Sequence, residues 1–191
     1  VDRLLHAPQL WSETALASPE ILHTLRNAFL AHSENEASLP KQSDAPPILV
    51  SRDDAPDRQL LNERNIAAEI ERQWGRCEIL KLSNLSFADQ IRAFSQAPLI
   101  VGALGQGFAN LLAANGALCL ILDTEPDWAE SYFSRTFRDL AILNGCLASR
   151  VFANTPIKKR DHWTYPEERF KTELLTATKL WQSNHPSPKS L

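Results

Sequence analysis

A glycine-rich turn supplies backbone groups that suit this sequence to binding an anion. Gly102, Gly105 and Gly107 interrupt an apolar run, and a Leu-rich pattern of small residues follows to Ala114. A strand that ends in such a turn and leads into a helix presents free backbone N–H groups and the positive end of the helix at one point. In α/β folds this point commonly binds a nucleotide phosphate. A tight turn that only lets helix and sheet pack closely is the alternative interpretation.

Two arginines flank a charged loop that follows a short apolar stretch, Ile48–Ser51. Arg52 and Arg58 would leave the same edge of the sheet as the glycine turn, where they could clamp a diphosphate. The planar guanidinium donates two parallel hydrogen bonds to phosphate, which suits arginine to this role. The alternative is that both arginines form ion pairs within the loop, whose acidic residues are Asp53, Asp54 and Asp57.

Three amides and one carboxylate are weaker candidates for contacts to a nucleoside or a sugar. Asn62 and Glu63 follow Arg58, Gln90 lies in the next predicted helix, and Asn110 ends the glycine-rich segment. Each also has a structural explanation. A glutamate at a helix N-terminus is favourable by itself, and Gln90 fits a polar position on a helix surface.

Several other chemistries lack their motifs. The glycine turn has neither the third glycine of a dinucleotide fingerprint nor the Gly-Lys-Ser/Thr of a phosphate-binding loop. Asp53-Asp54 lacks the spacing of a metal-binding Asp-x-Asp, and no His/Cys group has metal-ligand spacing, so we expect no metal and no cofactor. No Ser-His-Asp or Cys-His order indicates a catalytic triad.

Alternating apolar runs and amphipathic stretches indicate the elements that must position these residues. We expect strands at 48–51, 78–82, 99–102, 118–122 and 146–152, and helices at 19–32, 59–74, 86–96, 108–114, 132–144 and 166–182. This alternation predicts a doubly wound, Rossmann-like α/β fold with a parallel sheet. We expect residues 1–46 to be an N-terminal helix and linker left from a longer chain, 47–182 the Rossmann-like domain, and 183–191 a frayed tail.

Composition excludes some partners. The 191 residues carry a net charge of −3 and are 43% apolar, which is enough for one substantial core but gives no basic field for nucleic acid. No apolar run is long enough for a membrane span. Three cysteines lie in or beside apolar runs, as expected of free thiols in a reducing compartment, the cytoplasm.

Taken in order, these segments resemble the catalytic-domain signature of glycosyltransferase family 61, a group that includes bacterial capsular polysaccharide enzymes. The matching residues are Ser51-Arg52, Arg58, Asn62-Glu63, Leu85–Gln90, Phe94, Ala97, Val101-Gly102, Gly105, Gly107 and Asn110-Leu111. The likeness covers roughly residues 47–123, and a weaker likeness extends over residues 163–174.

The resemblance implies one half of a GT-B fold, the C-terminal half that binds the donor. It implies metal-independent, inverting transfer of a sugar from a nucleotide-sugar to a glycan or polysaccharide acceptor, with no cofactor. By position, Arg52, Arg58 and the turn Gly105-Gln106-Gly107 would contact the donor diphosphate. Asn62, Glu63, Gln90 and Asn110 would shape the rest of the site.

Two departures from the family pattern keep other functions open. Members usually carry Pro-His-Gly-Ala at the turn, whereas Leu104 stands at the histidine position here. The N-terminal domain that contacts the acceptor also has no counterpart in the sequence, and no residue is evident as the general base. A degenerate module that binds a nucleotide or nucleotide-sugar without catalysis is therefore the alternative to a transferase, and an NAD-dependent or scaffolding Rossmann domain is the third hypothesis.

Overall fold

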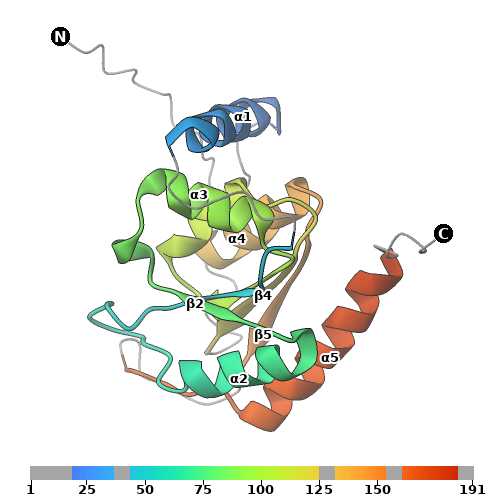
Figure 1. Ribbon diagram of the computed structural model, residues 1–191. Coiled ribbons are helices and arrows are strands. Elements are labelled where there is room, and N and C mark those ends of the chain that lie inside the picture. Colours follow the sequence, from blue (N-terminus) through green and yellow to red (C-terminus); the bar gives the residue numbers. More distant parts are fainter. Residues whose placement is uncertain (1–18, 37–43, 125–131, 154–160, 185–191) are drawn as a thin grey trace.

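A five-stranded, all-parallel sheet forms the centre of the molecule, as the computed structural model shows (Figure 1). The structure describes residues 19–36, 44–124, 132–153 and 161–184. The strands are β1 (Ile48–Val50), β2 (Glu78–Leu80), β3 (Leu99–Ala103), β4 (Leu118–Asp123) and β5 (Leu147–Phe152), in the order β2-β1-β3-β4-β5. The predicted Rossmann-like α/β class is confirmed.

Helices cover both faces of this sheet. On one face lie α1 (Pro19–Glu36), α3 (Phe87–Gln96) and α4 (Tyr132–Leu143), and on the other lie α2 (Glu63–Trp74) and α5 (Glu167–Asn184) (Figure 1). Successive residues of a strand point to opposite faces. Thus Ile100 joins the core beneath α3 and α4, while its neighbours Leu99 and Val101 join the core beneath α2 and α5. Both faces are apolar at the centre of the sheet, which explains why β1, β3 and β4 are nearly continuous apolar runs.

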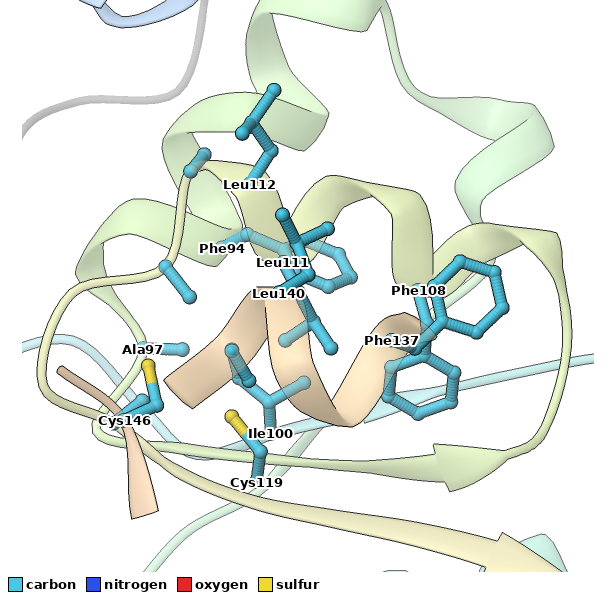
Figure 2. Packing of buried hydrophobic residues seen from close by; sticks show 14 of the residues in the cluster. Phe94, Ala97, Ile100, Phe108, Leu111, Leu112, Cys119, Phe137, Leu140 and Cys146 are labelled. Carbon is cyan, nitrogen blue, oxygen red and sulfur yellow. The ribbon is translucent and has the colours of Figure 1, made fainter. Parts of the chain in front are cut away.

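Aromatic rings fill much of the core beneath α3 and α4, which we call the first core. Figure 2 shows Phe108 and Phe137 beside each other, with their ring centroids 6.3 Å apart. Cys119 and Cys146 lie at the bottom of the same cluster, and both are buried free thiols, as expected; Cys77 is half-buried. None of the described helices is both long and apolar enough to cross a lipid bilayer.

Helix α1 forms an outer layer that packs against α3. Leu22 is buried against the first core, and the guanidinium of Arg92 on α3 donates to the backbone carbonyl of Ser33 at 2.5 Å. This docking extends α1 to Glu36, four residues beyond the predicted end. Residues 1–18 of the predicted N-terminal segment, and 185–191 of the predicted tail, lie outside the described residues.

Two local predictions are wrong. Helix α2 begins at Glu63 and not at residue 59. Leu61 is 62% exposed, whereas Leu60 is buried and forms an isolated parallel bridge with Trp163. Phe87, the first residue of α3, is 45% exposed although it packs edge-on against Phe29 of α1. The expected helix at 108–114 is a 3₁₀ helix, η2, at Gln106–Leu112.

Candidate functional site

The candidate site lies where the strand order reverses. Strand β2 is on one side of β1 and β3 is on the other, so the segments that leave β1 and β3 diverge: α2 covers one face and η2 the other. In open parallel sheets, ligands bind beyond the carboxyl ends of the strands at this reversal. Arg52 follows β1 and Gly105 follows β3, so the two predicted elements of the anion site meet there.

Arg52 lies directly against the glycine turn. A Cβ added to Gly105 would overlap Nη1 of Arg52 and would be 2.9 Å from its Cζ, so the guanidinium occupies the place of a side chain at residue 105. The Nε atom of Arg52 is buried without a hydrogen-bond partner. Among the described residues, Arg52 has no carboxylate within ion-pair distance. The sequence prediction that Arg52 approaches this turn agrees with the geometry.

The turn also offers backbone donors. The amide of Leu104 donates to the carbonyl of Leu122 at 2.8 Å, and that of Phe108 donates to the carbonyl of Gly105 at 3.1 Å. The three amides between them, at Gly105, Gln106 and Gly107, donate to no acceptor in the described part of the chain. Consecutive free N–H groups beside a guanidinium form a surface that suits an anion. The side chain of Gln106 is exposed.

The glycines at this turn also permit close packing. A Cβ at Gly102 would be 2.9 Å from the carbonyl oxygen of Val50, and one at Gly107 would be 2.8 Å from Cδ1 of Leu82. The structural interpretation of the turn therefore accounts for Gly102 and Gly107. It does not account for Gly105, where the three atoms nearest to an added Cβ all belong to Arg52.

Arg58 adds a second positive charge to the site. Burial lowers the pKa of Arg52, and the charge of Arg58 lowers this pKa further, against the opposing effects of nearby carboxylates. Arg58 is half-exposed, and its Nε is 3.8 Å from Asp57 Oδ1, a long contact for an ion pair. Asp53 instead pairs with Lys81 at 2.9 Å, which lowers the pKa of Asp53. The alternative in which both arginines form ion pairs within the loop thus applies to Arg58 alone.

Glu63 holds the loop that carries Arg52. One carboxylate oxygen accepts from the Ser51 hydroxyl at 2.6 Å, and the other accepts from the backbone amide of Arg52 at 2.8 Å. The Ser51 hydroxyl in turn accepts from the amide of Asp53 at 3.2 Å. The first residue of α2 thus fixes the backbone of the arginine. A ribose or base contact by Glu63 would have to share these oxygens, and it stays a prediction.

The side-chain amide of Asn62 faces a distant part of the chain. Its Nδ2 donates to the carbonyl of Tyr165 at 2.8 Å, and its Oδ1 accepts from the amide of Tyr165 at 3.0 Å. This pair of bonds ties the start of α2 to the segment before α5.

Gln90 and Asn110 contact each other on the other side of the reversal. Asn110 Nδ2 donates to Gln90 Oε1 at 2.9 Å, and Gln90 Nε2 donates to the carbonyls of Leu82 and Leu85 at 3.0 and 3.2 Å. These bonds connect α3, η2 and the loop after β2. The structure thus brings Arg52 into contact with Gly105 and Gln90 into contact with Asn110, while Asn62 points toward Tyr165. Arg58 is near enough for its charge to lower the pKa of Arg52.

Two charged features near this edge were not predicted from the sequence. Lys81 follows β2 and pairs with Asp53. Asp123, the last residue of β4, and Arg150, within β5, form a buried ion pair at 2.8 Å in which Asp123 also accepts from the amide of Thr124. For Lys81 and Asp123 the position at a strand end is the only sequence signal, and Arg150 lies in no recognisable motif.

The position at which the family pattern has histidine carries no titratable group. Leu104 is half-buried and packs against the first core. Among the residues that the structure describes, no three His, Cys, Asp or Glu side chains gather as a metal site would require.

The fold and the site define a Rossmann-like domain with a cationic, amide-lined edge at its topological reversal. The family model of Glycosyltransferase 61 matches residues 3–121, which is more than half of the chain. The chain belongs to the glycosyltransferase 61 family. No curated protein matches it. Membership in a glycosyltransferase family implies a sugar donor and an acceptor as substrates.

Proposed function

We propose that this domain binds the diphosphate of a nucleotide-sugar donor at Arg52, Arg58 and the turn Gly105–Gly107. The contact of Arg52 with Gly105 is the observation that carries the proposal. The half-buried guanidinium of Arg52 lies beside three backbone amides that have no acceptor in the described part of the chain. A half-buried cation without a carboxylate partner is costly, and a bound phosphate would supply the missing charge and hydrogen-bond acceptors.

In transfer, the acceptor hydroxyl attacks the anomeric carbon of the sugar while the bond to the nucleoside diphosphate breaks. The two guanidiniums and the turn amides would stabilise the negative charge that develops on the leaving diphosphate. We propose that this charge stabilisation needs no metal and that a single displacement inverts the anomeric carbon. Asn62, Glu63, Gln90 and Asn110 would set the position of the nucleoside or the sugar.

The wider context of the reaction is also a proposal. We place residues 47–182 as the donor-binding half of a GT-B enzyme, with the acceptor, a glycan or capsular polysaccharide, bound partly by an N-terminal domain. A bacterial cytoplasm would keep the three free cysteines reduced.

Calorimetric titration with UDP, GDP, CDP and their sugars tests donor binding. We expect at least one of them to bind, and Arg52→Ala to weaken it about 10- to 150-fold, since hydrogen bonds to charged groups contribute roughly 1.5–3 kcal/mol. Arg76→Ala is the matched control, because Arg76 precedes β2 at the opposite edge of the sheet and pairs with Asp44 at 2.9 Å. Equal losses in both variants, or no binding by the unchanged chain, would contradict the proposal.

A non-catalytic binding module is the second candidate, and Leu104 is the observation that favours it. Sugar release from the bound donor separates the two functions. A transferase should release sugar slowly to water or to an added glycan, whereas a binding module should not. Leu104→His restores the family residue, so release that appears only in this variant would support the degenerate module.

A further inference from the structure

Arg58 has an unusual backbone conformation. Its φ is +54°, the only positive φ of a non-glycine residue in the described part of the chain. An L-residue with a side chain rarely adopts this left-handed conformation, because its Cβ approaches the backbone carbonyl. The surrounding structure must therefore hold Arg58 in place.

A segment more than 100 positions later in the sequence provides that support. We call residues 162–165 the strap. Trp163 Nε1 donates to the carbonyl of Arg58 at 3.3 Å. The backbone of Trp163 also pairs with the residues after Arg58. Its amide donates to the carbonyl of Gln59 at 2.9 Å, and its carbonyl accepts from the amide of Leu61 at 2.7 Å.

Both ends of the strap are fastened. At one end, Nδ1 of His162 accepts from the amide of Gln59 at 3.2 Å. At the other end, the side-chain amide of Asn62 forms two hydrogen bonds with the backbone of Tyr165. Trp163 is only 4% exposed and packs edge-on against Tyr165, with ring centroids 6.2 Å apart. The strap is thus anchored in the core beneath α2 and α5 and cannot easily follow a movement of the loop.

We propose that Trp163 is a positioning residue for ligand binding: the strap holds Arg58 in its left-handed conformation and so directs its guanidinium toward the phosphate group beside Arg52. This inference rests on the proposed function, because it gives Arg58 a ligand. Without the indole N–H, the carbonyl of Arg58 loses a donor, and the backbone can relax to a commoner conformation that carries the side chain elsewhere.

Inorganic pyrophosphate and the tightest-binding of UDP, GDP and CDP are the probes for a calorimetric test. Trp163→Phe removes the indole donor and keeps an aromatic ring. Trp181→Phe is the matched control, since Trp181 Nε1 also donates to a backbone carbonyl, that of Gly116 at 2.8 Å, away from the site. We expect Trp163→Phe to weaken binding about five- to tenfold, the value of one net hydrogen bond, and Trp181→Phe to leave it unchanged.

Arg58→Ala shows whether the effect passes through Arg58. In the Arg58→Ala background, adding Trp163→Phe should weaken binding no further. An equal loss in both backgrounds, or no loss from Trp163→Phe in the wild type, would overturn the inference. If Arg52→Ala still weakens binding in that case, the proposed function stands without the strap. If the unchanged chain binds none of the probes, both fail.

Hydrogen exchange in the unchanged chain gives a second test if Trp163→Phe does not fold. If ligand and strap are coupled, saturating pyrophosphate should slow exchange of the Leu61 and Trp163 amides. The Leu147 amide, which donates to the carbonyl of Ala117, is the reference for general stabilisation. Equal slowing at all three amides, or none at all, would contradict the coupling.

Discussion

Gly105→Ala should separate binding from folding at this site. The backbone of Gly105 is extended, with φ −175° and ψ 174°, so alanine fits it without backbone strain. The three atoms nearest to the added Cβ all belong to the Arg52 side chain, and its Nη1 would overlap it. Because that atom is at the end of a flexible side chain, the guanidinium must move and the fold need not.

The expected magnitudes follow from this geometry. Displacing Arg52 loses hydrogen bonds between a charged donor and a phosphate, at roughly 1.5–3 kcal/mol, so the dissociation constant should rise about 10- to 150-fold. The free energy of unfolding should change by less than about 1 kcal/mol, because alanine restricts the unfolded chain at a compatible position and thereby offsets the cost of moving the side chain.

Calorimetry with the nucleoside diphosphate that binds, together with urea unfolding, measures both quantities. Gly105→Ala should weaken binding no further when Arg52 is already alanine, since the two changes remove the same contact. The reasoning would be refuted if Gly105→Ala bound as tightly as the unchanged chain while Arg52→Ala did not. It would also be refuted if Gly105→Ala unfolded the domain.

The remaining predictions concern stability and reactivity. Gly102→Ala should lower the free energy of unfolding by about 1–3 kcal/mol in urea, because its Cβ would meet the backbone oxygen of Val50 at 2.9 Å, which cannot rotate away; an unchanged midpoint would contradict this. Arg150→Met should cost about 3–5 kcal/mol in the same assay by leaving Asp123 as a buried, unpaired charge, and a loss below about 1 kcal/mol would argue against it. Burial raises the pKa of the Cys77 thiol from 9.0 to about 12. The native state therefore favours the protonated thiol. The contribution of Cys77 to the free energy of unfolding is constant below pH 9 and falls as the pH rises toward 12. Iodoacetamide should then alkylate Cys77 far more slowly at pH 9 in the native chain than in urea, and equal rates would show that the thiol is not protected.

Much of the fold could be predicted because both faces of the sheet are buried. A strand with two buried faces is apolar throughout, and the runs of β1, β3 and β4 stand out between amphipathic stretches. The start of α2 could not be predicted in this way. Leu60 and Leu61 continue the helical pattern, but Leu60 forms a parallel bridge with Trp163, more than 100 positions away, and no local pattern carries that contact.

Part of the candidate site could likewise be predicted from the sequence, and part could not. That Arg52 and the glycine turn meet follows from parallel strands, whose carboxyl ends share one edge. The bond between Gln90 and Asn110 depends on how α3 packs beside η2, which spacing within the sequence does not determine. The bonds of Glu63 to Ser51 and Arg52 form because the loop after β1 turns back toward the start of α2, and spacing within the sequence does not determine this turn either.

The distance in sequence between Arg58 and the strap has a consequence for how the chain acquires its structure. Closing a loop of this length costs more chain entropy than forming any of the neighbouring strand–helix units, and contacts between such distant residues form late in folding. The sheet and α2 can assemble while Trp163 is still being synthesised. We expect a chain released from the ribosome before residue 163 to have its glycine turn but an unfixed Arg58, so the complete cation pair would mature only after most of the chain has been translated.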